Sequence, residues 1–214
     1  MRKERRDFDF SKRAATYDKG LKGRASRRFY DLLECEMKLS DGMRLLDVGS
    51  GTGMLLARLS AIKHIDAHGI DVETHMIDAA RRQFPAGTFC LAPSEKIPYP
   101  DESFDVLTAC MAYHHFHDQA GFAKEASRVL KPGGQLYIAD AKLPFLIRKT
   151  INGMARLLRV VGAFVTAEEI KSRFTKYGFR FDGVASSGFA QVVCFVRDTS
   201  VCPINGQTAL RQNR

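Results

Sequence analysis

The sequence predicts an α/β fold built on a mixed, mostly parallel sheet with helices on both faces. Three observations support this fold class. Short apolar runs alternate with segments of helical period from Met43 onward, which is typical of parallel strands connected by helices. A glycine-rich turn directly follows the first of these runs. The chain has 214 residues and is 45% hydrophobic, so it is long enough for one well-packed domain of ordinary size.

Seven strands are expected, because seven short apolar runs are bounded by turn-forming residues. They cover residues 44–48, 65–71, 88–91, 104–110, 135–139, 179–185 and 191–196. The last two runs are separated by a short connection containing Ser186-Ser187-Gly188, which leaves no room for a crossover helix. We therefore expect these two strands to form an antiparallel hairpin, which makes the sheet mixed at one end.

Helical period and stop signals define the other segments. Residues 20–38 are expected to form a helix, since apolar residues recur along one side; these are Leu21, Ala25, Phe29, Leu32 and Leu33. Another helix is expected to begin near Asp118, and Pro132-Gly133-Gly134 is expected to end it and start the fifth strand. Residues 41–200 then form the main domain, preceded by a basic helical lid over residues 1–40 and followed by a polar tail over 201–214.

Residues 142–165 form an insertion between the fifth strand and the last helix, without strand-like alternation. Its apolar residues are Leu146, Ile147, Ile151, Met154, Leu157 and Leu158, and its basic residues include Arg148, Lys149, Arg156 and Arg159. As a helix, this segment would lie on a membrane surface, roof an apolar pocket or pack on the sheet. We expect it to cover the substrate, and peripheral contact with a membrane remains an open alternative.

The net charge of +9 is concentrated near the N-terminus, since residues 1–28 contain 11 Lys and Arg against 4 Asp and Glu. A basic arm of this kind can steer an anionic partner, touch anionic lipid or form a solvated helix face. The arm lacks interleaved aromatic residues and a known reader module. The solvated face is therefore the leading interpretation, and nucleic acid is a less favoured partner.

Cysteine spacing and the lack of targeting signals indicate the compartment. The five cysteines include no C-x-x-C pair, which fits neither a zinc site nor a disulfide framework. The basic start of the chain has no adjoining apolar core, and no run of 18 uncharged apolar residues occurs. We expect a soluble protein of the reducing cytoplasm.

The strongest local signal is an apolar strand that runs into the glycine-rich turn Asp47-Val48-Gly49-Ser50-Gly51-Thr52-Gly53. Glycines at the carboxyl end of a first strand let the backbone approach a ligand closely. The dinucleotide fingerprint would place its third glycine at position 54, but Met54 stands there, which argues against a dehydrogenase. Asp71 ends the second strand, where a carboxylate can accept both hydroxyl hydrogens of a ribose. Capping of the next helix is the alternative role for Asp71.

Two later segments extend this pattern, Pro93–Leu107 and Glu125–Gly134. Together with the glycine loop and Asp71, they resemble the ordered motifs of Rossmann-like (class I) S-adenosylmethionine-dependent methyltransferases. The resemblance is strongest to small-molecule enzymes similar to the ubiquinone and menaquinone biosynthesis methyltransferases, and it covers roughly residues 10 to 140. It implies a Rossmann-like methyltransferase fold and S-adenosyl-L-methionine as the cofactor.

The resemblance also implies which residues bind the cofactor. They are Tyr17, Asp47, Gly49, Ser50, Gly51, Thr52, Gly53, Asp71, Val72, Ser94, Glu95 and Cys110. Tyr17, within Phe10–Asp18, matches an aromatic residue that covers the cofactor, and a surface tyrosine is the alternative. Pro93 stands where such sequences commonly place an acid for the adenine amino group. We expect the backbone N–H of Ser94 and the carboxylate of Glu95 to serve the adenine instead.

A histidine-rich segment, Tyr113-His114-His115-Phe116-His117, follows the fourth strand. Methyl transfer from a sulfonium is an in-line displacement that mainly requires alignment and exclusion of water, so neither a metal nor a covalent nucleophile is expected. An acceptor hydroxyl or acidic carbon would also require a base, for which His114 and His115 are the candidates. A structural role is the main alternative, and a metal site is a weaker one because no acidic ligand has suitable spacing.

These observations predict methyl transfer from S-adenosylmethionine to a small organic acceptor, either lipid-like or aromatic. One alternative is an RNA methyltransferase, which rests on the basic arm alone and lacks an Asn/Asp-Pro-Pro-aromatic run after the fourth strand. The other is a non-catalytic, cofactor-binding regulatory module, for which Pro93 is the positive sign. The sequence specifies neither the acceptor atom nor the oligomeric state.

Overall fold

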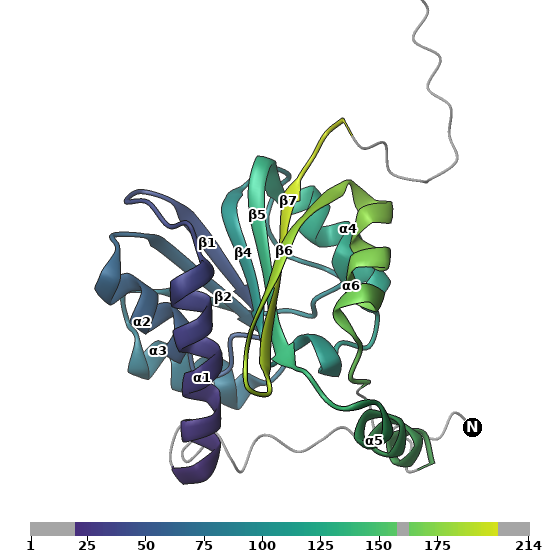
Figure 1. Cartoon of the computed structure of the whole chain (residues 1–214). Coiled ribbons are helices and arrows are strands. Elements are labelled where there is room, and N and C mark those ends of the chain that lie inside the picture. The colour runs from purple at the N-terminus through teal and green to yellow at the C-terminus, as the bar shows by residue number, and fades with distance from the viewer. Residues whose placement is uncertain (1–19, 158–162, 201–214) are drawn as a thin grey trace, which may run out of the picture.

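The computed structural model describes residues 20–157 and 163–200, and the sheet lies at its centre (Figure 1). Its seven strands are arranged in the order β3-β2-β1-β4-β5-β7-β6. Their bounds are Arg44–Val48 for β1, Asp66–Asp71 for β2, Thr88–Leu91 for β3, Phe104–Cys110 for β4, Leu130–Ala141 for β5, Phe179–Ser187 for β6 and Ala190–Arg197 for β7. Strands β1 to β5 pair in parallel, whereas β7 is antiparallel to both β5 and β6. The predicted mixed sheet with a terminal hairpin is confirmed.

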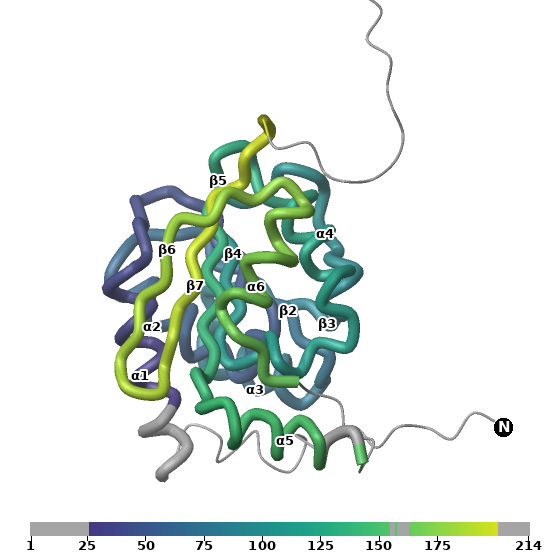
Figure 2. Tube along the Cα trace, turned by 45° about the vertical axis from the view of Figure 1, so that its right-hand side comes forward, coloured from purple at the N-terminus to yellow at the C-terminus, as the bar shows by residue number. Residues whose placement is uncertain are grey.

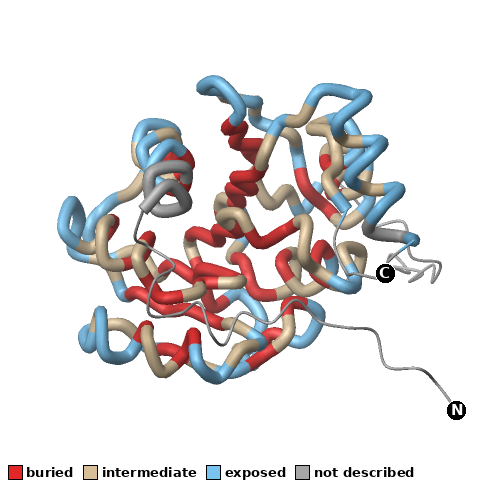
Figure 3. The backbone as a smooth tube through the Cα atoms, turned by 90° about the horizontal axis from the view of Figure 1, so that it is seen from below, coloured by how far each residue is buried: buried red, intermediate tan, exposed pale blue. Residues whose placement is uncertain are grey.

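Helices cover both faces of this sheet (Figures 1 and 2). They are α1 (Gly20–Glu36), α2 (Met54–Ile62), α3 (Thr74–Gln83), α4 (Gln119–Val129), α5 (Phe145–Leu157) and α6 (Ala167–Phe174), with short 3₁₀ helices η1 at Tyr113–His115 and η2 at Thr175–Tyr177. One buried cluster joins α1, α2 and α3 to one face, and a second joins α4 and α6 to the other. Figure 3 shows buried backbone between more exposed outer segments.

Alternating residues of each strand feed the two cores, because successive side chains point to opposite faces of a sheet. In β1, Leu45 belongs to the core under α1 and α2, whereas Leu46 belongs to the core under α4. The expected apolar side of α1 is confirmed at Phe29 and Leu33, which are 1% and 0% exposed. No helix within residues 20–157 and 163–200 is long and apolar enough to cross a membrane.

The expected boundary between α4 and the fifth strand is wrong. Asp118 does cap the start of α4, accepting hydrogen bonds from Ala120 N at 3.1 Å and Gly121 N at 2.8 Å. However, α4 ends at Val129 and β5 begins at the next residue, so the Pro-Gly-Gly segment at 132–134 lies inside the strand. Leu130 already pairs with Phe104, and the register shifts between Phe104 and Val106. Early pairing with β4 therefore overrides the local stop signal.

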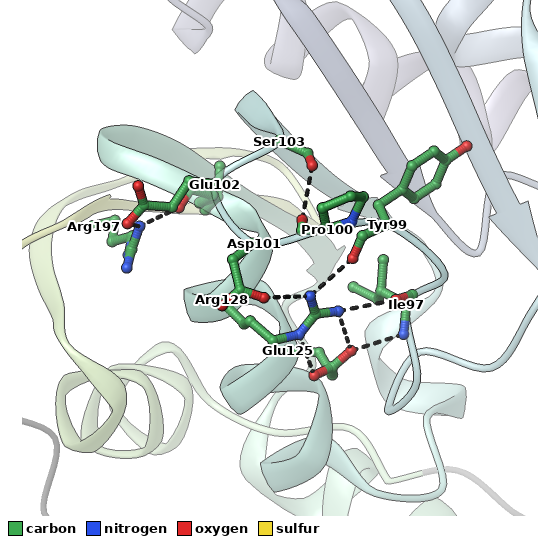
Figure 4. A network of polar contacts seen from close by, with 10 residues as sticks. Ile97, Tyr99, Pro100, Asp101, Glu102, Ser103, Glu125, Arg128 and Arg197 are labelled. Atoms are coloured by element: carbon green, nitrogen blue, oxygen red, sulfur yellow. Dashed lines mark hydrogen bonds and ion pairs between the residues drawn. The ribbon is translucent and has the colours of Figure 1, made fainter.

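Arg128 on α4 fixes the loop that leads from the cavity edge to β4 (Figure 4). Its guanidinium donates to Ile97 O at 2.9 Å and to Tyr99 O at 2.8 Å, and it pairs with Asp101 at 2.8 Å. Glu125, one turn earlier on α4, pairs with Arg128 at 2.7 Å and accepts a hydrogen bond from Ile97 N at 2.9 Å. The two later sequence motifs therefore hold each other in place, which sets the position of the preceding residues 92–95.

Candidate functional site

A cavity of about 300 Å³ lies beyond the carboxyl ends of β1, β2 and β4. This is the position at which open α/β sheets bind ligands. Its lining residues are Tyr30, Asp47, Val48, Gly49, Ser50, Gly51, Thr52, Leu55, Asp71, Val72, Glu73, Met76, Ala92, Pro93, Ser94, Glu95, Cys110, Met111, Ala112, His115, Phe116 and His117. The structure therefore brings eleven of the fourteen predicted residues to one cavity: ten of the twelve cofactor residues, and His115 of the two candidate bases.

The glycine loop is held against β2 by backbone hydrogen bonds. Gly49 N and Ser50 N both donate to Ile70 O, at 2.8 and 2.9 Å. Gly49 has a φ of +76°, and a Cβ there would lie 2.4 Å from Ala112 Cβ. Gly51 has a φ of +52°, but a Cβ there would meet nothing within 4 Å. Gly49 is therefore required by a neighbouring segment, whereas Gly51 leaves its backbone open toward the cavity.

Gly53 is the one loop glycine that does not line the cavity. A Cβ on Gly53 would lie 2.8 Å from Phe89 Cζ, and its φ is +76°. The residue lies between the loop and the first residue of α2, Met54. Its lack of a side chain therefore serves packing of the loop onto β3, and the structure does not place it among the groups that can contact a ligand.

Asp47 is 2% exposed and accepts a hydrogen bond from Thr108 Oγ1 at 2.7 Å. Burial raises the pKa of its carboxyl to about 7; the hydrogen bond from Thr108 opposes this shift, and repulsion from Asp71 adds to it. The side chain is thus close to half-protonated at neutral pH. A cationic ligand in the cavity would favour its ionised form.

Asp71 connects the glycine loop to the start of α3. Its Oδ2 accepts from Gly51 N at 2.9 Å, and its Oδ1 accepts from Glu73 N at 3.0 Å. Burial raises the pKa of the Asp71 carboxyl, and the backbone N–H groups of Glu73, Gly51 and Val72 oppose this. Each carboxylate oxygen can accept a second hydrogen bond. Asp71 therefore orders the loop and also faces the cavity with acceptor capacity.

The far edge of the cavity is formed by Pro93, Ser94 and Glu95. Ser94 is 6% exposed, and its Oγ donates to Glu95 Oε2 at 3.2 Å. Ala92 N donates to Asp71 O at 2.9 Å, which ties this edge to the end of β2. The proline therefore does not displace the segment from the cavity, and a carboxylate stands two residues after it.

The hydroxyl of Ser50 is buried between the glycine loop and β2. Its residue is 7% exposed, and its Oγ has no hydrogen-bond partner within the described ranges 20–157 and 163–200. Buried hydroxyl groups are usually paired, and each exception calls for an explanation. A Cβ on Gly69 of β2 would lie 2.7 Å from the Ser50 Oγ, so the hydroxyl packs between the loop and β2 and is not presented to a ligand in the cavity.

The two candidate bases separate in the structure. His115 lines the cavity, and burial lowers the pKa of its imidazole to about 4, with the neighbouring His114 lowering it further and Asp140 opposing. His114 does not line the cavity. Its Nδ1 donates to Asp140 Oδ1 at 2.8 Å, and its ring stacks on Phe164 with centroids 4.3 Å apart. His115 is therefore the histidine that can contact a substrate, and the His114 ring packs against it with centroids 3.9 Å apart.

Sequence reasoning missed several lining residues, most clearly Tyr30 and Met111. Tyr30 comes from α1, more than a dozen positions before the glycine loop, and its ring lies under the Arg58 guanidinium at 5.6 Å. Met111 directly follows β4 with a φ of +55°, and its N donates to Ala139 O at 2.8 Å. Such a conformation costs on the order of 1 kcal/mol in a non-glycine residue and clusters at functional sites. Neither residue belongs to a sequence motif. Tyr17, the residue predicted to cover the cofactor, lies outside the described residues.

The thiol at this cavity is not activated as a nucleophile. Cys110 lines the cavity, but burial raises the pKa of its thiol well above the ordinary value, and Asp47 and Asp140 raise it further. It therefore stays protonated and is a poor nucleophile. In the part of the chain that the structure describes, no group of three or more His, Cys, Asp or Glu side chains is placed to hold a metal ion.

Comparisons with known proteins place this geometry in context. A family model described as a methyltransferase domain matches residues 46–138. The chain is 32% identical over 156 residues to a demethylmenaquinone methyltransferase from Chlorobaculum tepidum, covering 72% of this chain and 62% of that protein. It is 34% identical over 152 residues to a 27-O-demethylrifamycin SV methyltransferase from Amycolatopsis mediterranei, covering 67% and 54%. The chain thus spans less than two thirds of the length of these relatives.

A solved structure of a SAM-dependent methyltransferase from Aquifex aeolicus superposes with a TM-score of 0.68. The two chains are 23% identical, and the superposition covers 89% of this chain and 99% of the other. At this level of identity the likeness establishes a shared fold. The seven-stranded Rossmann-like arrangement expected from the sequence is therefore confirmed.

Proposed function

We propose that the chain, which matches a methyltransferase domain over residues 46–138, is a Rossmann-like, class I methyltransferase that transfers a methyl group from S-adenosylmethionine to a small organic acceptor. The observation that carries this proposal is the cavity wall formed by the glycine loop, with its open backbone at Gly51, and by the carboxylate of Asp71. The relatives named above are methyltransferases of a quinone precursor and of a rifamycin, so the family includes small-molecule acceptors.

The residues present fit the cofactor. The open backbone at Gly51 would lie at its amino-acid end, and Asp47 would face its positive charge. Asp71 would accept the ribose hydroxyl hydrogens with the acceptor sites not used by Gly51 and Glu73. Ser94 and Glu95 would lie at the adenine. When bound, S-adenosylmethionine supplies a methyl group activated by a sulfonium.

The histidine-bearing wall favours a particular kind of acceptor. Burial lowers the pKa of His115 to about 4, which leaves its imidazole neutral but weakly basic, so it would assist only an acceptor whose own hydroxyl or carbon is acidic. Met111, Ala112 and Phe116 add apolar surface beside His115. This combination supports an aromatic or lipid-like acceptor that carries an acidic hydroxyl or an acidic carbon.

Neither alternative gains support from the site. The basic residues that suggested an RNA substrate lie mostly within residues 1–19, which are outside the described residues. Pro93 suggested a non-catalytic module, but the segment that contains it still lines the cavity with Ser94 and Glu95. Turnover on a small molecule is therefore the function that the geometry supports best.

Calorimetric titration of the full chain with S-adenosylmethionine and, separately, with NAD tests the proposal. We expect S-adenosylmethionine to bind with a Kd of about 1–10 μM and NAD not to bind. Asp71→Asn should weaken binding about 10- to 100-fold, since it removes the charge from several hydrogen bonds. Asp78→Asn on α3 is the matched control, because Asp78 is an acid outside the cavity lining and should leave affinity unchanged. Binding of NAD alone would refute the proposal.

A further inference from the structure

Helix α5 contacts the rest of the protein through its polar side. Arg148 Nη1 donates to Glu169 Oε2 at 2.8 Å, and this pair links α5 to the start of α6. One turn further along α5, Asn152 makes two hydrogen bonds with the backbone of Phe164. Asn152 Nδ2 donates to Phe164 O at 2.9 Å, and Phe164 N donates to Asn152 Oδ1 at 3.0 Å. Arg148 and Asn152 are also less exposed than the residues on either side of them.

The apolar side of α5 consequently points to solvent. Leu146, Met154 and Leu157 are 74%, 56% and 81% exposed. Ile147 and Ile151 extend the same side, at the i, i+4, i+7 spacing that leads to Met154. A helix that covers a core shows the opposite arrangement, with its apolar side buried. Contiguous apolar surface of this kind marks an interaction site rather than ordinary packing.

The helix lies at the end of the molecule that holds the cavity. It begins four residues after Ala141, the last residue of β5, beyond the carboxyl ends of the parallel strands (Figures 1 and 2). It is also connected to the cavity wall, since Asn152 binds Phe164 and Phe164 stacks on His114. Anything that covers the apolar side of α5 would therefore sit near the cavity entrance.

The charge of this segment indicates what covers it. Residues 142–157 contain four basic residues and no acidic residue. Two copies that packed through α5 would bring these like charges together. A surface of anionic lipid headgroups instead complements them, and its acyl region accepts Leu146, Met154 and Leu157. We propose that α5 is a membrane-surface anchor that inserts its outward apolar side into an anionic lipid bilayer. This inference does not depend on the proposed methyl transfer.

A single tryptophan tests the insertion directly, because the chain contains none. Met154→Trp places the reporter on α5, and Ile62→Trp at the end of α2 is the matched control, since the two native side chains are 56% and 57% exposed. The full-length variants are mixed with vesicles of phosphatidylcholine and phosphatidylglycerol in equal parts. We expect a blue shift of fluorescence and quenching by lipids brominated on the acyl chains for Met154→Trp alone.

Vesicle sedimentation tests which residues contribute to binding. The double substitution of Leu146 and Leu157 by Gln should weaken binding to the anionic vesicles about tenfold or more. Val184→Gln, on β6, changes another exposed apolar residue and should leave binding unchanged. The anchor is refuted if the wild type does not sediment with anionic vesicles or if the double variant binds as well as the wild type. Dimerisation in analytical ultracentrifugation that the double variant abolishes would instead identify a second copy as the occupant.

Discussion

The cavity has two sides that are built in different ways. The glycine-loop side comprises residues 47–52 and 71–73, and the histidine side comprises residues 110–117, supported by Asp140 and the segment 163–164. The first is ordered mainly by backbone hydrogen bonds between the ends of two adjacent parallel strands. The second is ordered by side chains from segments far apart in the sequence, such as the pairing of His114 with Asp140.

Burial shifts the pKa values of the two sides in opposite directions. It raises the pKa of Asp47 to about 7 on the glycine-loop side and lowers the pKa of His115 to about 4 on the histidine side. In both residues the neutral form is favoured because a charge loses hydration in the cavity wall. The proposed cofactor would bring a positive charge into this environment. The two sides therefore respond differently to that charge: Asp47 can ionise and become its counter-ion, whereas a protonated His115 would repel it.

The point where the two sides touch should be the most sensitive. Gly49→Ala would place a methyl group 2.4 Å from Ala112 Cβ, at a φ of +76°. We expect a loss of about 3 kcal/mol in the free energy of unfolding, from the strained backbone together with the clash. Binding of S-adenosylmethionine should fall below detection, since relief of the clash would move the loop. Denaturant unfolding and calorimetric titration measure the two effects.

Gly133→Ala separates the clash from the backbone strain. Gly133 also has a φ of +76°, but a Cβ there would meet nothing within 4 Å. Gly133→Ala should therefore lower the free energy of unfolding by only about 1 kcal/mol. Equal losses for the two variants would show that Ala112 yields without cost, and the two sides would then not be coupled at this contact.

The same division separates what the sequence predicted from what it did not. Asp47, Gly51 and Asp71, which the sequence predicts to bind the cofactor, do line the cavity, because their positions follow from short-range chemistry at strand ends. Sequence reasoning could not separate His114 from His115. Which of two adjacent histidines faces the cavity depends on Asp140 and Phe164, which the fold brings close from 26 and 50 positions away.

Fold-level predictions show the same limit. The strand pattern and the terminal hairpin were predicted, since period and turn residues are local properties. The start of β5 was predicted too late, because pairing of Leu130 with Phe104 is a tertiary contact that overrides the Pro-Gly-Gly signal. For α5, the sequence left membrane contact, a pocket roof and packing on the sheet as alternatives. Only the contacts of Arg148 and Asn152 show that its polar side is the attached one.

The histidine side can be examined through the pH dependence of stability. The folded-state pKa of His115 is about 4, below its ordinary value of 6.5. Between these values the unfolded chain binds a proton that the folded chain does not, so the free energy of unfolding rises with pH across this window. His115→Gln should remove this contribution. The free energy of unfolding of the variant minus that of the wild type should therefore be about 2 kcal/mol higher at pH 5 than at pH 7.5.

Phe116→Leu is the control for repacking of the cavity wall, because Phe116 lines the cavity but carries no titratable group. Its effect on the free energy of unfolding should be the same at both pH values. If His115→Gln also shows no pH dependence, His115 titrates as an exposed histidine would. The proposed uncharged histidine side would then be wrong.

The glycine-loop side should contribute a pH dependence of stability with the opposite sign. The folded-state pKa of Asp47 is about 7, above its ordinary value of 3.8. The folded chain therefore keeps a proton that the unfolded chain loses, and the contribution of Asp47 to the free energy of unfolding falls as pH rises between these values. Binding a cation favours ionised Asp47. We expect the affinity for S-adenosylmethionine to rise with pH up to about 7 and then level off, by at most about tenfold per pH unit.

Two variants test whether Asp47 is the group responsible for this pH dependence. Asp47→Asn cannot ionise, so its weaker binding should not change between pH 6 and pH 8. Thr108→Val removes the hydrogen bond of 2.7 Å that lowers the pKa of Asp47, so the pH at which affinity levels off should move upward. Calorimetry in two buffers of different ionisation enthalpy measures the proton released on binding. If the wild type releases none at pH 6.5, Asp47 is already ionised and the histidine side is the only one kept neutral by burial.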